Sequence, residues 1–397
     1  MYNPRTLTRS VISGIFKNIN MRTKHISNET KPMKMEKALI VSKLSRYEYE
    51  KTKHKNLSDK ELETLLRKRG SNYEKLISFH YLHKEFEEHL KNTLLALGTE
   101  VEVVNRFSCT DEKVEEADII IPIGGDGTFL LAASRVLNNK KPVIGFNSDP
   151  TRSEGYLCLP RWCSLNVCKT IEKLKQGDFQ WLMRTRIRIT LAVDEKDRLM
   201  PQSLHHVDGH FLPPLKGKCA PNVLPVLALN EVFMGETLSA RVSHLQMRLN
   251  NTEQVTNVKC SGICVSTGTG STSWHLSINR VSNQSIAEIL RLLSIHPDED
   301  RDNLARTLAN VYNKNLIFKP DDKRMGYTIR DLISSGVWPH PKGIKPRGFV
   351  STIEIKSHCF DAYLVLDGGI SFPFNDGAVA VLETLPEDAL RTVIFPK

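Results

Sequence analysis

The chain is organised around the stretch Ile119-Ile-Ile-Pro-Ile-Gly-Gly-Asp-Gly-Thr-Phe-Leu130. Its apolar start, 119–123, has the length and composition of a buried strand. The Ala- and Leu-rich residues that follow Thr128 predict a helix packed back onto a sheet. The glycines between them therefore belong to a strand-turn-helix connection at the carboxyl edge of a sheet, where α/β folds bind ligands.

The turn at 124–128 combines several properties of a binding site. Its three glycines let backbone amides approach a ligand closely, and amides at the start of a helix favour an anion. Asp126 is the single acid among them, so its carboxylate suits accepting a proton or holding a hydroxyl better than binding phosphate. Gly-Asp-Gly also occurs in ordinary turns, so this stretch alone does not define a site.

Length and composition describe a soluble globular protein of two domains. The chain has 397 residues, 40% of them apolar and 25% charged. No run approaches the roughly 18 apolar residues of a membrane span. The evenly spaced Cys158, Cys163 and Cys168 lack a neighbouring histidine, so we expect reduced thiols rather than a zinc site.

The amino-terminal segment differs from the rest. Residues 1–28 contain five basic residues and no acid, which accounts for half of the formal net charge of +10. Apolar residues between Val11 and Ile19 recur at helical spacing, and this pattern predicts a mitochondrial transit peptide over residues 1–30. The alternative is a disordered basic tail. The remaining charge suits a small anionic substrate and does not require nucleic acid.

The order of the expected elements divides the chain. Strands alternate with helices up to residue 146, which predicts a parallel doubly wound α/β domain over 36–165. Short segments of alternating polarity then predict a β-rich domain over 166–375. In the first of them, Arg186 and Arg188 fall on the face expected to be exposed. Residues 376–397 are expected to form a returning tail.

Two further stretches carry polar groups next to apolar strands. Asn230-Glu231 follows the apolar residues 226–229, and the stretch 261–277 is dense in Gly, Ser and Thr. Hydroxyls and free amides at that density can surround a phosphate-bearing ligand, although such loops are usually only loops. Neither a Walker P-loop nor a complete G-x-G-x-x-G is present, which disfavours a standard P-loop kinase and a standard Rossmann dehydrogenase.

Taken together and in this order, the three stretches resemble the NAD kinase family over roughly residues 36–397. Gly-Gly-Asp-Gly-Thr is the family's hallmark, and Asn230-Glu231 matches its Asn-Glu motif. Thr267-Gly-Thr-Gly-Ser-Thr-Ser-Trp274 is similar to its Thr-Pro-Thr-Gly-Ser-Thr-Ala-Tyr loop. The stretch 145–159 and the basic amino-terminal segment resemble the mitochondrial branch.

The resemblance implies an amino-terminal doubly wound α/β domain, a carboxyl-terminal β-sandwich and a tail that packs back on the first domain. It also implies transfer of the γ-phosphate of ATP, carried with Mg²⁺, to the 2′-hydroxyl of the adenosine ribose of NAD, with Asp126 as proton acceptor. A homodimer in the mitochondrial matrix is expected, with no nucleic-acid or membrane partner.

The remaining site residues are also carried over from the resemblance. Those expected around nucleotide phosphates are Gly124, Gly125, Gly127 and Thr128. Asn230 and Glu231 are expected on the adenine and ribose side of NAD. The other implied nucleotide contacts are Arg241, Ser261, Thr267, Thr269, Gly270, Ser271, Thr272, Ser273, Trp274 and Ser277.

Two of these positions depart from the family pattern. Ser261 stands where the family has an aspartate, which removes a carboxylate expected to touch the substrate. Trp274 replaces a tyrosine and keeps an aromatic surface without the phenol.

Two other functions stay open at this point. Lipid kinases of the diacylglycerol or sphingosine type share Gly-Gly-Asp-Gly-Thr, but the polar loop 267–273 favours a nucleotide. A non-catalytic pyridine-nucleotide-binding protein is the third interpretation, and the presence of Asp126 argues against it.

Overall fold

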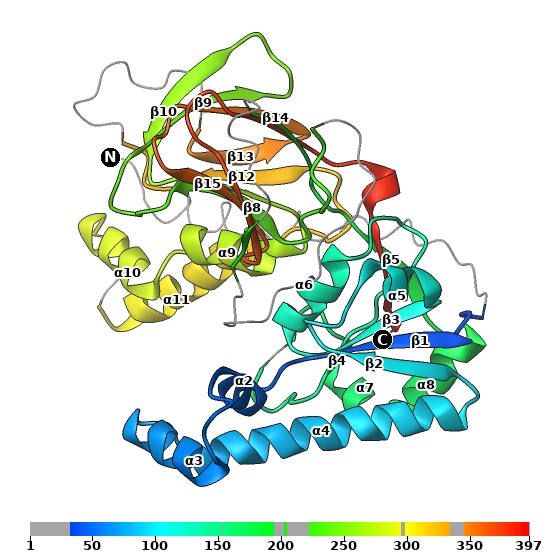
Figure 1. Cartoon of the computed structure of the whole chain (residues 1–397). Coiled ribbons are helices and arrows are strands. Elements are labelled where there is room, and N and C mark those ends of the chain that lie inside the picture. The colour runs from blue at the N-terminus through cyan, green and yellow to red at the C-terminus, as the bar shows by residue number, and fades with distance from the viewer. Residues whose placement is uncertain are drawn as a thin grey trace.

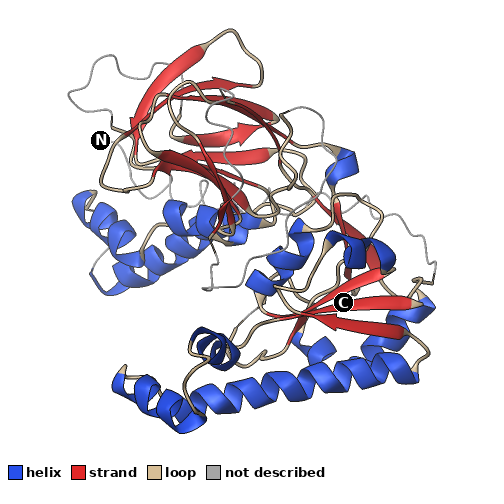
Figure 2. Ribbon diagram, viewed as in Figure 1, coloured by secondary structure: helices blue, strands red, loops and turns tan. Residues whose placement is uncertain are grey.

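A computed structural model describes residues 32–153, 155–193, 202–204, 222–294, 298–333 and 345–396. Within them, an α/β domain and a strand-rich domain are connected by a few extended segments (Figure 1). The predicted transit peptide, residues 1–30, lies outside the described residues. In Figure 2, which is coloured by secondary structure, helices flank the sheet of the first domain, and the second domain consists mainly of strands.

The first domain is built on a parallel sheet in the order β2-β1-β3-β4. Its strands are β1 (Lys37–Ser42), β2 (Glu100–Val104), β3 (Ile119–Gly124) and β4 (Phe146–Asn147). The surrounding helices are α2 (Arg46–Lys53), α3 (Asp59–Lys68), α4 (Tyr73–Ala96), α5 (Asp111–Glu116), α6 (Asp126–Ser134), α7 (Arg161–Leu165) and α8 (Val167–Gln176). The doubly wound parallel architecture is therefore confirmed.

The buried residues of β3 explain why this strand organises the domain. Ile119, Ile121 and Ile123 pack with the α4 leucines Leu90 and Leu94 on one face of the sheet. Ile120 points to the other face and packs with Phe129 of α6. Successive side chains of a strand point to opposite faces, so a continuous apolar run is what a strand covered on both sides requires. This packing fixes the turn between β3 and α6.

The second domain is a sandwich of two antiparallel sheets, as predicted. One sheet has the order β10-β9-β14-β17-β6, and the other has the order β13-β12-β11-β8-β15-β16-β7. The strands are β6 (Arg188–Ala192), β7 (Gln202–Ser203), β8 (Glu231–Glu236), β9 (Ser243–Leu249), β10 (Val255–Cys260), β11 (Ile263–Ser266), β12 (Met325–Ile329), β13 (Arg347–Val350), β14 (Thr352–Ser357), β15 (Ala362–Leu366), β16 (Ile370–Pro373) and β17 (Val379–Glu383). Their inward side chains form one continuous core.

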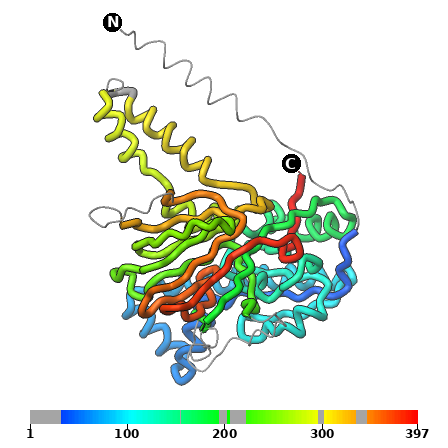
Figure 3. Tube along the Cα trace, turned by 90° about the horizontal axis from the view of Figure 1, so that it is seen from above, coloured from blue at the N-terminus to red at the C-terminus, as the bar shows by residue number. Residues whose placement is uncertain are grey.

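Helices of the second domain lie outside the sandwich. They are α9 (Trp274–Asn279), α10 (Asn283–Leu292) and α11 (Asp298–Asn315). From above, the α10–α11 pair extends away from the strands (Figure 3).

The carboxyl-terminal tail returns to the first domain. Strand β18 (Leu390–Ile394) pairs antiparallel with β5 (Gln180–Arg184), and a parallel bridge joins Arg391 to Pro142 beside β4. The apolar side of α8 contributes to the first core, whereas β17 belongs to the sandwich. Helix α8 therefore packs in the first domain, and strand β17 in the second.

Candidate active site

The turn after β3 accepts only glycine at its first position. Gly124 has φ of +152°, and a Cβ there would lie 2.6 Å from Thr128 Oγ1 and 2.9 Å from Lys43 Cβ. Gly125 is the N-cap of α6 and supplies no side-chain cap. The first amides of α6 are therefore left without a competing side-chain acceptor, which is the usual arrangement for binding an anion.

Asp126 is the first residue of α6 and is half-buried at the turn. Its Oδ1 accepts a hydrogen bond of 2.9 Å from the backbone N–H of Leu157. Within the described part of the chain, Oδ2 accepts no hydrogen bond. One oxygen is thus anchored by the loop after β4 while the other stays available to a ligand.

Arg184 joins this turn to the Gly/Ser/Thr loop of the second domain. It lies at the end of β5, and its Nη1 donates to Thr269 Oγ1 at 3.3 Å. Its Nε is buried and has no hydrogen-bond partner among the described residues. Burial lowers the pKa of Arg184 to about 10, and the charge of Asp126 opposes that shift. Nothing in the sequence alone predicts a role for this residue.

Arg186, two residues further along the chain, is buried although the sequence pattern predicted that it is exposed. The alternation of residues 186–191 placed Arg186 on an exposed face, but it is fully buried. The segment is interrupted between β5, which pairs with the tail, and β6, which enters the sandwich. Arg186 sits at this junction, where its guanidinium donates to backbone carbonyls of Asp388, Ala133 and Val136. Alternation within a segment predicts a face, but not what covers that face.

Asn230 and Glu231 are held at the start of β8 by Asp367, whose role was not predicted from the sequence. The Asp367 carboxylate, in the β15–β16 turn, accepts N–H bonds from Leu229 at 2.8 Å, Asn230 at 2.7 Å and Glu231 at 3.1 Å. Burial raises the pKa of Asp367 to about 6 against the effect of these three bonds. An Asp-Gly-Gly turn carries no signal that distinguishes this role.

The polar side chains of this pair are buried but not satisfied. Asn230 Oδ1 and Glu231 Oε2 have no partner within the described residues. Burial, together with the nearby charge of Asp367, raises the pKa of Glu231 to about 8. Buried acceptors normally have a donor, so two acceptors left without one set this pair apart from ordinary core residues.

The Gly/Ser/Thr loop packs directly on the backbone of Asn230. Thr267 Oγ1 donates to Leu229 O at 2.5 Å and accepts the Gly270 N–H at 3.1 Å. A Cβ at Gly270 would lie 2.1 Å from Asn230 O. The buried hydroxyl of Ser271 donates to Gly268 O at 2.7 Å. Thr267 and Ser271 therefore hold the loop in shape through their own side chains.

The second half of the loop is more accessible. Thr272, Ser273 and Trp274 are partly buried and Ser277 is exposed. The Trp274 ring packs against Phe233 of β8 with 4.7 Å between centroids. These residues lie at the start of α9, next to the loop that contacts Asn230.

Gly268 departs from the family pattern, which has proline at this position, and its surroundings explain why. A Cβ at Gly268 would lie 1.7 Å from the backbone oxygen of Lys319. The chain after α11 therefore occupies the space that a side chain would need.

Ser261 and Arg241 lie near the end of strand β8 that is opposite to Asn230-Glu231. Strand β11 pairs with β8 so that Ser266 faces Glu231 and Ile263 faces Met234. Ser261 precedes β11, and its N–H donates to Arg330 O at 2.9 Å. Arg241, in the β8–β9 loop, forms an ion pair with Glu236 at 3.6 Å. Within one chain, neither is brought to Asp126.

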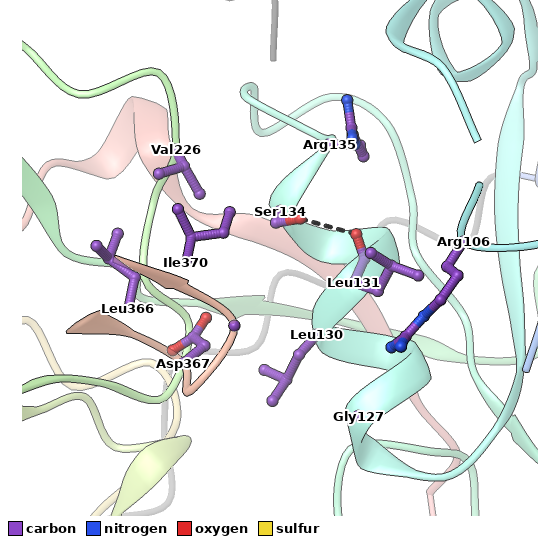
Figure 4. Close-up of a pocket in the computed structure, with 11 residues that line it drawn as sticks. Arg106, Gly127, Leu130, Leu131, Ser134, Arg135, Val226, Leu366, Asp367 and Ile370 are labelled. Atoms are coloured by element: carbon purple, nitrogen blue, oxygen red, sulfur yellow. Dashed lines mark hydrogen bonds between the residues drawn. The ribbon is translucent and has the colours of Figure 1, made fainter. Parts of the chain in front are cut away.

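A cleft with a volume of about 80 Å³ lies between helix α6 of the first domain and the β15–β16 turn of the second (Figure 4). Leu130 of α6 faces Asp367 and Ile370 across it, and Arg106 approaches from the far side of the helix. The helix that begins with Asp126 and the carboxylate that positions Asn230-Glu231 therefore share one cleft.

Metal ligands and membrane spans were also sought in the structure. The described residues contain no group of three or more His, Cys, Asp or Glu side chains arranged to hold a metal ion. In the same part of the chain, no helix has the length and apolarity needed to span a membrane.

Comparisons with known proteins agree with this arrangement. The family model described as the ATP-NAD kinase N-terminal domain matches residues 14–157. "NAD kinase 2, mitochondrial" from Rattus norvegicus is 37% identical over 382 residues, covering 90% of this chain and 87% of its own. The protein of the same name from Xenopus tropicalis is 37% identical and covers 93% of both chains.

A solved structure shows the same fold. The crystal structure of yeast NADH kinase complexed with NADH superposes with a TM-score of 0.52 at 15% identity, covering 94% of this chain and 88% of the other. At that identity the likeness supports the architecture alone. The sequence relationship over nine-tenths of the chain is stronger, and it shows that the chain belongs to the NAD kinase family.

Proposed function

We propose that the chain is an ATP-dependent NAD kinase, which transfers the γ-phosphate of ATP to the 2′-hydroxyl of the adenosine ribose of NAD and releases NADP. One observation carries the proposal beyond family membership. The cleft is lined by Gly127, which follows Asp126, and by Asp367, whose carboxylate holds the backbone of Asn230 and Glu231. Among the described residues, one Asp126 oxygen and the buried Asn230 Oδ1 and Glu231 Oε2 have no hydrogen-bond partner. A dinucleotide would supply hydroxyl donors for these acceptors and phosphates for the amides of the turn.

Asp126 is the proposed proton acceptor. Phosphoryl transfer depends mainly on alignment and charge neutralisation. The attacking hydroxyl must also lose its proton as the new P–O bond forms, and a carboxylate within hydrogen-bond reach can accept it. The Leu157 amide holds one oxygen of Asp126 and so orients the other toward the hydroxyl.

Asn230 and Glu231 are the proposed contacts for the adenosine side of NAD. A hydroxyl or amino group of the ligand would donate to Asn230 Oδ1 and Glu231 Oε2, which have no donor among the described residues. Leaving a buried acceptor unpaired costs about 1–3 kcal/mol. Ligand binding would recover that cost, and this selects a ligand rich in hydroxyl donors.

Charge neutralisation is the proposed role of Arg184. Arg184 is partly buried and interacts electrostatically with Asp126, and its Nε–H has no acceptor among the described residues. The transferred phosphoryl group carries negative charge on its oxygens, and a fixed cation in a site shielded from water stabilises that charge. Mg²⁺ is expected to enter with ATP, held mainly by phosphates and waters, and to supply further neutralisation.

The test of function is a comparison of acceptors. The purified chain is incubated with ATP and Mg²⁺ and with either NAD or diacylglycerol. We expect NADP and no phosphorylated lipid. Phosphorylation of lipid alone would favour the lipid kinase, and binding of NAD without turnover would favour a nucleotide-binding protein that has lost catalysis.

Localisation in the mitochondrial matrix is part of the proposal. Its support is the acid-free basic segment at residues 1–28 and the word mitochondrial in the names of the relatives. A fusion of residues 1–35 to a reporter should reach the matrix. A diffuse cytosolic signal would contradict it.

A homodimer is also proposed. Ser261 and Arg241 lie at the end of the sheet remote from Glu231, so any contact they make with NAD would come from a second copy. Light scattering on the purified chain should give the mass of two subunits. A monomer that makes NADP would contradict this arrangement.

A further inference from the structure

A buried histidine connects the two strands that flank β3. His83 of α4 is fully buried, and both of its ring nitrogens have a partner. Nε2 is 2.9 Å from Oγ of Ser42, the last residue of β1, and Nδ1 is 3.0 Å from Oγ of Ser148, which follows β4. Strand β3, which ends at Gly124, lies between β1 and β4 in the sheet. His83 therefore bridges across the strand that carries the turn at 124–128, and the proposed catalytic steps do not use it.

The hydrogen bonds around His83 fix which group donates each proton. Ser42 Oγ is also hydrogen-bonded to Glu87 Oε2, and the Glu87 carboxylate forms an ion pair with Lys84 at 3.2 Å. An ionised carboxylate only accepts hydrogen bonds, so the Ser42 hydroxyl donates to Glu87. The Nε2–H of His83 then donates to Ser42, and Nδ1 is left to accept a hydrogen bond from the Ser148 hydroxyl.

The imidazole of His83 is neutral, as this chain of hydrogen bonds requires. Burial lowers the pKa of His83 to about 3, and the charges of Lys43 and Lys84 act in the same direction. A neutral imidazole has one donor and one acceptor nitrogen. Each ring nitrogen of His83 therefore has a single defined role in the bridge.

The two strand ends joined by His83 act directly on the backbone of the turn. The N–H of Ser148 donates to Gly124 O at 3.3 Å, and the N–H of Lys43 donates to Ile123 O at 3.0 Å. These two carbonyls are the last of β3. The bridge through His83 thus connects the donors that hold the end of this strand on both sides.

The loop that begins at Ser148 also anchors the proposed proton acceptor. Further along this loop, the N–H of Leu157 donates to Asp126 Oδ1 at 2.9 Å. Nδ2 of Asn147 donates to Ser153 O at 2.9 Å and holds the loop close to the end of β4. A displacement of Ser148 would therefore disturb both the backbone of the turn and the amide that orients Asp126.

We propose that His83 is a positioning residue for phosphoryl transfer: its Nδ1 accepts the Ser148 hydroxyl and so holds the loop after β4 against the turn, which keeps Asp126 aligned. His83 contacts no reacting atom and acts through Ser148. Misplacement of a reacting group by about 1 Å can cost about 100-fold in rate, so the bond needs to prevent only a small displacement. The inference rests on the proposed kinase function and adds a residue that positions its catalytic group.

The first test removes the hydroxyl that His83 accepts. Ser148→Ala keeps the backbone N–H that donates to Gly124. Ser357→Ala is the matched control in the second domain, because Ser357 is also buried and its hydroxyl donates to Phe374 O at 2.6 Å. We expect both variants to melt a few degrees lower. Only Ser148→Ala should lower kcat for NADP formation, by about tenfold, with the KM for NAD and for ATP within about twofold of the parent chain.

Two substitutions at His83 separate its two hydrogen bonds. His83→Asn places an amide oxygen near the position of Nδ1 and keeps an acceptor for Ser148, whereas His83→Gln places its amide near Nε2 and keeps a donor for Ser42. We expect His83→Asn to retain about threefold more kcat than His83→Gln or better, because it keeps the bond to the loop. Equal kcat in the two His83 variants would overturn the inference, and so would equal kcat in Ser148→Ala and Ser357→Ala.

A spectroscopic measurement tests the bridge independently of activity. The ring nitrogens of the full chain containing ¹⁵N-labelled histidine are observed by NMR at neutral pH, and the signals of His83 are those lost in His83→Asn. We expect a neutral ring with its proton on Nε2, and a charged ring or a proton on Nδ1 would contradict the inference. If the expected ring is found but the parent chain makes no NADP, the proposed kinase function fails, whereas the hydrogen bond between His83 and Ser148 stands.

Discussion

Glu231 is a buried carboxyl group whose Oε2 has no donor in the part of the chain that the structure describes, and its ionisation therefore works against folding. Its pKa is about 8 in the folded chain, compared with about 4.3 in an unfolded one. Between these values the folded chain keeps a proton that the unfolded chain releases. The contribution of Glu231 to stability thus falls as pH rises through this interval, and the loss is complete above about pH 8.

Glu231→Gln should remove this pH-dependent loss. The melting temperature of the variant should rise relative to the parent chain between pH 5 and pH 9, reaching a difference of several degrees at the upper end. Glu383→Gln, at a partly exposed carboxylate in β17, is the control and should show no such trend. A difference between Glu231→Gln and the parent chain that stays constant with pH would contradict the account.

Arg184→Met tests the proposed cation. Removing a fixed charge from the developing phosphoryl group should lower kcat by about 100-fold with a small effect on the affinity for NAD. Arg184→Lys should recover part of the rate, and added guanidinium should partly rescue the methionine variant. Arg248→Met, at an ion-paired strand arginine of β9, is the control. Loss of NAD binding with kcat intact would assign Arg184 to substrate binding instead.

At the scale of elements, the β3–α6 connection depends more on Gly124 than on Gly125. A side chain at Gly124 would collide with Thr128 and Lys43, and its φ of +152° is unfavourable for other residues. A Cβ at Gly125 meets nothing within 4 Å. The two positions are adjacent, so they form a matched pair.

Gly124→Ala should lower stability by about 2 kcal/mol and reduce kcat sharply, because the shifted turn misplaces Asp126. Gly125→Ala should change stability by less than about 1 kcal/mol. Urea denaturation and steady-state kinetics on both variants measure the difference. Equal effects at the two positions would contradict the assigned geometry.

Local elements of this fold were predictable because their causes are local. The run 119–123, the glycines and the following Ala-rich residues specify strand, turn and helix within a dozen positions. The polar partners were not predictable in this way. Asp367 reaches Asn230 across more than a hundred residues, and Arg184 reaches Thr269 from another domain. No periodicity in sequence marks such contacts, and alternation even assigned the buried Arg186 to an exposed face.

At the scale of the whole molecule, Arg186 ties the domains and the tail together. Its guanidinium donates to Asp388 O at 2.6 Å and Ala133 O at 3.2 Å, and also to Val136 O. Ala133 lies in the last turn of α6, and Val136 follows the C-cap residue Arg135. A cation at this carboxyl-terminal end interacts favourably with the helix dipole. The helix that begins with Asp126 is thus fixed at its far end by the link to the second domain.

Arg186→Met should leave these carbonyls without a donor and destabilise the chain by about 3 kcal/mol. Amide exchange in β18 should accelerate, because the tail loses its anchor at Asp388. Arg280→Met, at an exposed arginine after α9, should leave both quantities unchanged. Normal protection of β18 in Arg186→Met would show that pairing with β5 suffices to hold the tail.

The central claim is that Asp126 accepts the proton of the ribose hydroxyl as ATP phosphorylates NAD. The most direct measurement is the rate of NADP formation by Asp126→Asn at saturating ATP and NAD, with NAD binding measured by calorimetry on the same preparation. The account predicts NAD affinity within about threefold of the parent chain and a rate lower by about 100-fold or more. NADP formation by Asp126→Asn at the parent rate would contradict it.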